Sequence, residues 1–88
     1  MTLYEFYGES CPHCENMASK VEQLGEEEDV ELKQLEVWND QDNAEKMQEF
    51  DDGKCGGVPF FYNKETEEWI CGETDMETLK DWASGKEV

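Results

Sequence analysis

The stretch ESCPHCENM, residues 9–17, places two cysteines three positions apart, with a proline and a histidine between them. Two cysteines this close can bind a metal, form a structural disulfide or act as a redox dithiol. Pro12 suits the first position of a helix, because its missing N–H would have no partner there. We therefore expect a helix that begins at Pro12 and has Cys11 as its cap residue.

The predicted helix carries an apolar stripe with the spacing of helical turns. Its members are Cys14, Met17, Ala18, Val21 and Leu24. Gly25 is expected to end the helix. Cys14 belongs to the stripe and should face the core, whereas Cys11 should be exposed at the helix N-terminus.

The elements around this junction predict an α/β domain. Predicted strands cover 3–7, 30–38, 58–63 and 67–72, and further helices run from Asn39 or Asp40 to about Phe50 and over 74–83. The order β-α-β-α-β-β-α predicts one domain over residues 1–88, with a four-stranded mixed sheet flanked by three helices. Two βαβ-type connections should make the first strands parallel, and the last two strands form an antiparallel hairpin.

Local patterns refine three of these elements. The strand over 30–38 has apolar residues on both faces, so we expect it to be central in the sheet. In the third helix, Thr74 and Glu77 have the spacing of a capping box. Core or half-buried positions are expected for the tryptophans, which are Trp38, Trp69 and Trp82. An exposed tryptophan near Cys11 could instead contact substrate, but the sequence does not say which one.

The charge balance restricts the partners. Seven lysines, no arginine and 24 acidic residues give a net charge of −17. Nucleic acids and anionic membranes need a basic surface, so neither is expected as a partner. Basic client proteins, adaptation to high salt or a merely solvated acidic surface each remain compatible with this charge.

The start of the chain, MTLYEFYGES, has neither a basic region nor an apolar core of a signal peptide. The apolar runs are too short to cross a bilayer. We expect a cytoplasmic monomer, and four cysteines in such a protein favour catalysis or metal binding over structural disulfides.

The element order together with CPHC (11–14) and GVPFF (57–61) resembles the thioredoxin superfamily. YEFYGESC (4–11) is similar to the strand that leads to the active site of protein disulfide isomerase domains. The resemblance implies a thiol–disulfide oxidoreductase that acts on protein disulfides or dithiols, with a redox partner that the sequence does not identify. It implies no cofactor and no metal.

The same resemblance assigns a substrate-binding role to Val58 and Pro59. In this superfamily the equivalent proline is cis, faces the two cysteines and leaves backbone groups free to pair with an extended substrate. CPHC itself is similar to the active site of the disulfide donor DsbA. The chain lacks room for the helical insertion of that family, and Ser10 stands where thioredoxins often have tryptophan.

Two other functions compete with this interpretation. The length and the Val-Pro pair also resemble glutaredoxins, but CGETD (71–75) matches their glutathione site only in part, and a surface charge of −17 would repel anionic glutathione. The other alternative is a thioredoxin-fold adaptor or metal-binding module. Cys55 and Cys71 are too far apart to supply a second metal-binding C-x-x-C.

The chemistry of disulfide exchange gives each residue of the motif a role. Cys11 is the expected nucleophile, because helix N–H groups stabilise its thiolate, and Cys14 is the resolving thiol. Pro12 stiffens the turn, and His13 adds positive charge when protonated. Glu9 and Glu15 oppose these effects.

Three further residues are candidates with open alternatives. Glu5, six residues before Cys11, matches a buried proton-relaying acid of the superfamily, unless it is a surface glutamate. Cys55, in the loop before Pro59, is either a secondary redox thiol or an ordinary loop residue. We expect Cys71 to be packed within its strand, and the spacing does not settle whether Cys55 and Cys71 form a disulfide.

Overall fold

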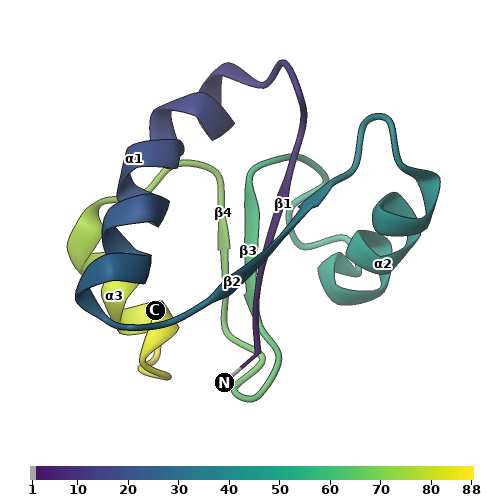
Figure 1. The fold of residues 1–88 in the computed structure, drawn as a ribbon. Helices are drawn as coiled ribbons and strands as arrows, with labels where there is room; N and C mark the ends of the chain where they lie inside the picture. Colours follow the sequence, from purple (N-terminus) through teal and green to yellow (C-terminus); the bar gives the residue numbers. More distant parts are fainter. Residues whose placement is uncertain (1) are drawn as a thin grey trace.

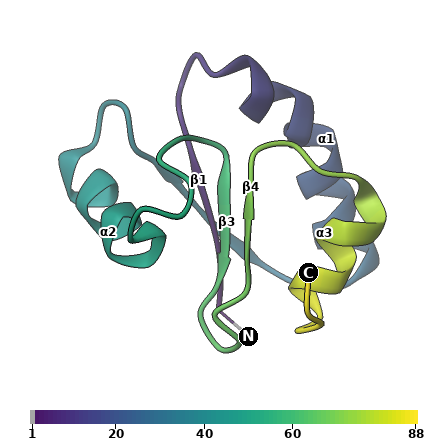
Figure 2. The ribbon, with the colours of Figure 1, turned by 180° about the vertical axis from the view of Figure 1, so that it is seen from behind.

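A computed structural model describes residues 2–88, and its element order is β-α-β-α-β-β-α, as predicted. The elements are β1 (Leu3–Tyr7), α1 (Pro12–Glu27), β2 (Leu32–Glu36), α2 (Gln41–Asp51), β3 (Phe60–Asn63), β4 (Trp69–Cys71) and α3 (Met76–Ala83). Helices α1 and α3 cover one face of the sheet and α2 covers the other (Figures 1 and 2). The predicted α/β class is therefore confirmed.

The sheet has the strand order β2-β1-β3-β4. Strand β1 runs parallel to β2 and antiparallel to β3, and β3 and β4 form the predicted antiparallel hairpin. The prediction of a central β2 is wrong, since β1 and β3 hold the central positions. Four residues of β1 and all of β3 are buried, whereas the residues of β2 are exposed or half-buried. The connection through α2 is also not a parallel crossover, because β3 runs against β1.

Two apolar clusters fill the space on either side of the sheet. The cluster under α1 and α3 contains Leu3, Met17, Val21, Leu24, Phe61, Ile70, Leu79, Trp82 and Ala83. The cluster under α2 contains Tyr4, Phe6, Met47, Phe60 and Tyr62. Neighbouring residues of β1 and β3 divide between the clusters, because successive side chains of a strand point to opposite faces. Glu5 therefore shares its face with Leu3, on the side of α1.

Helix α1 ends later than predicted. Helix α1 continues past Gly25 to Glu27, so Gly25 does not end it. A Cβ at Gly25 would lie 3.5 Å from the carbonyl oxygen of Val30, so this glycine lies beside the chain that enters β2. The turn is made instead by Asp29, with a φ of 50°.

Aspartates cap the other two helices. Asp40 caps α2 by accepting a hydrogen bond from the N–H of Asn43, in line with one of the two predicted caps. Helix α3 is capped by Asp75, not by Thr74. The Thr74 carbonyl instead accepts a hydrogen bond from Lys20 Nζ at 2.7 Å.

The three tryptophans have different environments. Trp82 is fully buried and donates its indole N–H to the Glu68 carbonyl, and Trp69 is half-buried. Trp38 is 56% exposed, so its predicted core or half-buried position is wrong.

Within residues 2–88, no helix combines the length and apolar character needed to span a bilayer.

Candidate active site

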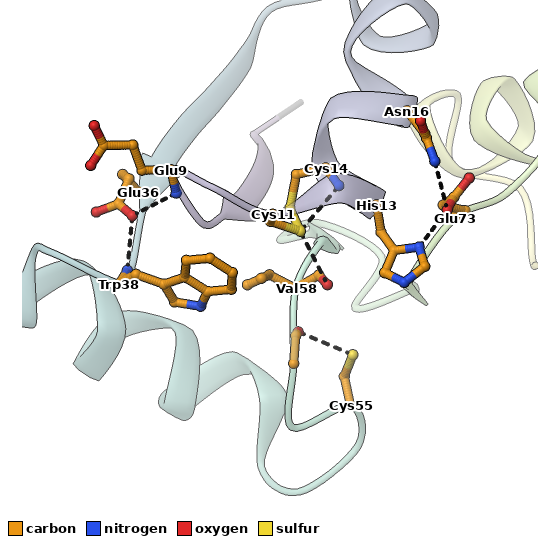
Figure 3. Close-up of a disulfide and its surroundings, with 11 residues drawn as sticks. Glu9, Cys11, His13, Cys14, Asn16, Glu36, Trp38, Cys55, Val58 and Glu73 are labelled. Carbon is orange, nitrogen blue, oxygen red and sulfur yellow. Dashed lines mark hydrogen bonds and ion pairs between the residues drawn. A yellow bond between two sulfur atoms is a disulfide. The ribbon is translucent and has the colours of Figure 1, made fainter.

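The CPHC motif lies where β1 leads into α1 (Figure 3). Cys11 caps the helix as predicted: its sulfur accepts a hydrogen bond from the backbone N–H of Cys14 at 3.1 Å, and Pro12 occupies the first helical turn. The Cys11 N–H donates to the Gly8 carbonyl at 3.2 Å. This geometry places the first sulfur at the positive end of the helix dipole, where an anion is stabilised.

Cys11 and Cys14 form a disulfide. Cys14 is buried, with 7% of its surface exposed, as its place on the apolar stripe predicts. Cys11 is only 3% exposed, so the expectation of an exposed first cysteine is wrong for this oxidised state. Its sulfur is covered on one side by Val58, whose carbonyl oxygen lies 3.8 Å away.

Val58 and Pro59 lie directly before β3 and next to the disulfide (Figure 3). The peptide bond between them is cis. The Pro59 carbonyl accepts a hydrogen bond from the N–H of Gly72 at 2.8 Å, which attaches this turn to the end of β4. The fold therefore brings together the two segments that the sequence singled out, although 44 positions separate Cys14 from Val58.

Glu5 is buried beneath the motif and is not a surface glutamate. It is 2% exposed, and its Oε1 accepts a hydrogen bond at 2.8 Å from Gln34, its cross-strand neighbour on β2. Burial raises the pKa of Glu5, and the Gln34 hydrogen bond partly opposes that rise. Glu5 and Cys14 both line a cavity of about 280 Å³.

His13 is directed away from the cysteines. Its Nδ1 lies 2.5 Å from Oε2 of Glu73, and Asn16 donates to the same oxygen at 3.3 Å (Figure 3). The hydrogen bond with His13, and then that with Asn16, holds the pKa of Glu73 below its usual value. A protonated His13 would therefore have an anionic partner, which weakens the positive charge that the sequence predicted beside Cys11.

Comparison with known proteins identifies the architecture. No protein-family model matches the chain, and no curated protein matches it significantly in sequence. Among solved structures, thioredoxin 1 from the thermophilic eubacterium Thermosipho africanus TCF52B is similar with a TM-score of 0.57, over 96% of both chains and at 15% sequence identity. The protein has the thioredoxin fold. The resemblance seen in CPHC and GVPFF is thus confirmed at the level of the fold.

Trp38 adds an aromatic side chain to this thioredoxin fold beside the motif. In Figure 3 its indole extends from the end of β2 toward Val58. Glu36 fixes the local backbone by accepting hydrogen bonds from the N–H groups of Glu9, Trp38 and Asn39 at 2.8–3.0 Å. Desolvation alone would raise the pKa of Glu36, but these hydrogen bonds outweigh it and lower the pKa. The sequence left open which tryptophan would lie exposed near Cys11, and the structure places Trp38 there.

The protein also contains a second disulfide, between Cys55 and Cys71. The expectation of a packed Cys71 is wrong, because Cys71 is exposed and its sulfur is bonded to Cys55. The sequence left this pairing open. The pairing depends on the register of the hairpin. Cys71 lies opposite Phe60, so it faces the side of the sheet that α2 covers, and Cys55 lies in the loop that follows α2.

Asp51, which was not among the predicted site residues, organises the loop that carries Cys55. The carboxylate is buried and accepts hydrogen bonds from the N–H groups of Cys55 and Gly56 at 2.5 and 2.7 Å. An aspartate at a helix end followed by a glycine-rich stretch was the available signal.

Within residues 2–88, no three side chains of histidine, cysteine, aspartate or glutamate gather as a metal site would require.

Proposed function

We propose that the protein is a thiol–disulfide oxidoreductase that exchanges disulfides with polypeptide substrates through Cys11 and Cys14. The observation that carries this proposal is the position of the Cys11–Cys14 disulfide at the N-terminus of α1, with the Cys14 N–H on the Cys11 sulfur. The same N–H would stabilise a Cys11 thiolate after reduction. The thioredoxin fold is consistent with this chemistry.

In the reducing direction, the Cys11 thiolate attacks one sulfur of the substrate disulfide. A mixed disulfide forms, and the other substrate sulfur leaves as a thiolate that takes up a proton. Cys14 then loses its proton and attacks the Cys11 sulfur. The Cys11–Cys14 disulfide forms, the substrate leaves as a dithiol, and two electrons have passed to it. The oxidising direction reverses these steps.

The buried carboxylate of Glu5 is suited to accept the proton of Cys14. A general base works best when its pKa approaches the operating pH, and burial raises the pKa of Glu5 in that direction. Glu5 and Cys14 line one cavity, so a water molecule in it would carry the proton between them. Glu5 would also return this proton when the reaction runs in reverse.

The backbone beside Val58 is suited to hold an extended polypeptide. It precedes β3 and lies next to Cys11, so a strand added there would bring its own cystine to the nucleophile. The net charge of −17 would favour basic clients over acidic ones by attracting them to the surface.

Trapping of the mixed disulfide tests this proposal. With Cys14→Ser, attack by Cys11 on a disulfide-bonded peptide should stop at a covalent adduct that mass spectrometry detects. With Cys11→Ser, no adduct at Cys14 should form at a comparable rate, because Cys14 lacks the helix-cap position that would stabilise a thiolate. If wild type and Cys14→Ser both fail to react with peptide disulfides, the proposal is wrong.

A redox titration of the wild type would give the direction of the reaction. A potential near the value of about −270 mV of thioredoxin would indicate a reductant, and one well above about −200 mV an oxidant or isomerase. Stoichiometric metal in the purified protein that is lost with Cys11→Ser would instead favour a metal-binding module.

A further inference from the structure

We propose that the Cys55–Cys71 disulfide is a second redox site, which controls how the CPHC site accepts polypeptide substrates. Its reduction would release the segment that carries Val58 without unfolding the domain. This inference rests on the proposed function of Cys11 and Cys14, because substrate exchange at that pair is its readout.

The second disulfide joins the two segments that touch the CPHC motif. Cys55 precedes Val58 by three positions, and the Val58 carbonyl lies 3.8 Å from the Cys11 sulfur (Figure 3). Cys71 precedes Glu73 by two positions, and Glu73 contacts His13 at 2.5 Å. The covalent bond therefore restrains both partners of the motif at once.

The second disulfide is also the more accessible of the two. Cys71 is exposed and Cys55 is partly exposed, whereas Cys11 and Cys14 are 3% and 7% exposed. Exchange requires an attacking thiolate to reach a sulfur atom. A small external dithiol can approach Cys71 without displacing any part of the sheet.

The reaction that opens this bond is an ordinary exchange with a dithiol reductant. A thiolate of the reductant attacks the Cys71 sulfur, the Cys55–Cys71 bond breaks, and Cys55 leaves as a thiolate that takes up a proton. The second thiol of the reductant loses its proton and attacks the mixed disulfide. Cys71 is released and protonated, and the reductant ends as a disulfide that has given up two electrons.

Noncovalent contacts would keep the fold in place after reduction. Asp51 still holds the N–H groups of Cys55 and Gly56, and the Gly72 N–H still donates to the Pro59 carbonyl. Between these anchors the loop is sparsely packed: a Cβ added at Gly56 or Gly57 would meet nothing within 4 Å. Gly56 also has a φ of 73°, which favours glycine over other residues. Loss of the disulfide should therefore loosen the stretch that leads to Val58.

A loosened Val58 should affect large and small substrates differently. A polypeptide that pairs with the backbone at Val58 loses binding when that backbone is mobile, since it must order the loop on binding. A small dithiol needs only access to the Cys11–Cys14 sulfurs. A purely structural disulfide would instead slow both substrates together or neither.

The experiment compares wild type with Cys55→Ser/Cys71→Ser, both starting with Cys11–Cys14 oxidised. Reduction of Cys11–Cys14 is followed by alkylation and mass spectrometry, with a dithiol peptide or with dithiothreitol as reductant. We expect the rate with the peptide to fall about threefold or more in the variant, in the range of coupling energies known for residues outside a site. The rate with dithiothreitol should change less than the rate with the peptide. Equal rates in the two proteins, or equal losses with both reductants, would overturn the inference.

A second variant allows reduction of the Cys55–Cys71 disulfide to be measured without the CPHC cysteines. In Cys11→Ser/Cys14→Ser, dithiothreitol should reduce Cys55–Cys71 while the circular dichroism spectrum stays folded. Reduction that occurs only when the protein unfolds would assign the bond a structural role and refute a second redox site. If wild type exchanges with neither reductant, the proposed function of CPHC fails, and this variant still reports whether Cys55–Cys71 can be opened.

Discussion

The indole of Trp38 lies directly over the backbone of Gly8, so that a Cβ added at Gly8 would lie 2.3 Å from the Trp38 Cδ2 atom. Gly8 in turn accepts a hydrogen bond from the N–H of Cys11 through its carbonyl. The exposed tryptophan is thus seated on the segment that leads into the CPHC motif. Glycine suits this position because of the close approach of the ring, not because of its own φ angle.

Substitution Gly8→Ala should displace Trp38 from the motif. Because 56% of Trp38 is exposed, its ring can swing into solvent, and we expect a smaller loss of stability than the roughly 1–3 kcal/mol typical of overpacking. The indole N–H resonance of Trp38 should shift in NMR spectra while that of buried Trp82 stays in place. Gly57→Ala is the matched control, since a Cβ there meets nothing within 4 Å. Unchanged Trp38 resonances in Gly8→Ala would contradict the stacking.

Substitution Glu5→Gln should alter the pH dependence of stability. Burial raises the pKa of Glu5 above its unfolded value of 4.5, so the ionised carboxylate disfavours the folded state. The contribution of Glu5 is most favourable below pH 4.5 and is lost as the pH rises through the folded pKa. Relative to wild type, Glu5→Gln should therefore be more stable at pH 7 than at pH 4, as measured by urea unfolding. A stability difference that does not vary with pH would rule out a buried titrating acid.

The same substitution should slow the resolving step. Without a carboxylate in the cavity, Cys14 loses a proton acceptor, so the mixed disulfide at Cys11 should persist longer in Glu5→Gln. Stopped-flow or quenched-flow measurement of adduct decay separates this step from the initial attack, which should be little affected. An unchanged decay rate would remove Glu5 from the proton path.

Substitution Glu73→Gln should increase the reactivity of reduced Cys11. Removal of this anion leaves the positive charge of protonated His13 uncompensated near the helix N-terminus, which favours the thiolate. The alkylation rate of the Cys11 thiol by iodoacetamide should rise at mildly acidic pH. Glu87→Gln removes the same charge from the exposed C-terminal segment and serves as the control. Equal rates for the two variants would show that the pair with His13 is not what restrains Cys11.

Loss of the second disulfide should lower stability more than loss of the first. The Cys55–Cys71 bond has a sequence separation of 16, for which the chain-entropy treatment gives about 3 kcal/mol. Cys11–Cys14 has a separation of 3, for which the same treatment gives about 2 kcal/mol. Denaturant unfolding of Cys55→Ser/Cys71→Ser and Cys11→Ser/Cys14→Ser should reproduce this order. The reverse order would mean that the Cys55 loop is already fixed by its other contacts.

Substitution Asp51→Asn should destabilise the loop before Val58. The buried carboxylate accepts two backbone hydrogen bonds, and an amide NH₂ group in place of one oxygen leaves one N–H unsatisfied. Such a loss costs about 1–3 kcal/mol in a buried site. Asp52→Asn is the control, because Asp52 is exposed and asparagine tolerates its φ of 45°. Equal stability of the two variants would show that Asp51 does not hold the loop.

The sequence predicts those parts of the fold that depend on local pattern. Cys11 as helix cap, Pro12 in the first turn and Asp40 as cap of α2 follow from residue preferences within a few positions. The order of the elements follows from hydrophobic periodicity in the same way. The position of β2 in the sheet does not follow from periodicity, because which strands pair with it decides whether a strand lies at the edge or the centre of the sheet. The apolar residues in and around β2 pack against the two apolar clusters, although the strand lies at the edge of the sheet.

The sequence predicts the chemical centre of the site better than its surroundings. Cys11, Cys14 and Pro59 stand in recognisable motifs, and the structure brings them together. The proximity of Trp38 to Gly8, and of Cys55 to Cys71, depends on strand order and hairpin register, which no local pattern encodes. His13 was expected to act on Cys11. Its ring nitrogen instead contacts the carboxylate of Glu73, which lies 60 positions away in the sequence.

The two borders of the sheet have a consequence for association between chains. An unpaired strand border invites lateral pairing and aggregation, which charged side chains and short strands discourage. On one border, β2 carries Lys33 and Glu36, and on the other, β4 is three residues long and ends at a cross-linked Cys71. An aromatic-rich sheet is thereby kept from growing sideways. Under the proposed function, an incoming strand would instead approach at Val58, beside the Cys11 sulfur.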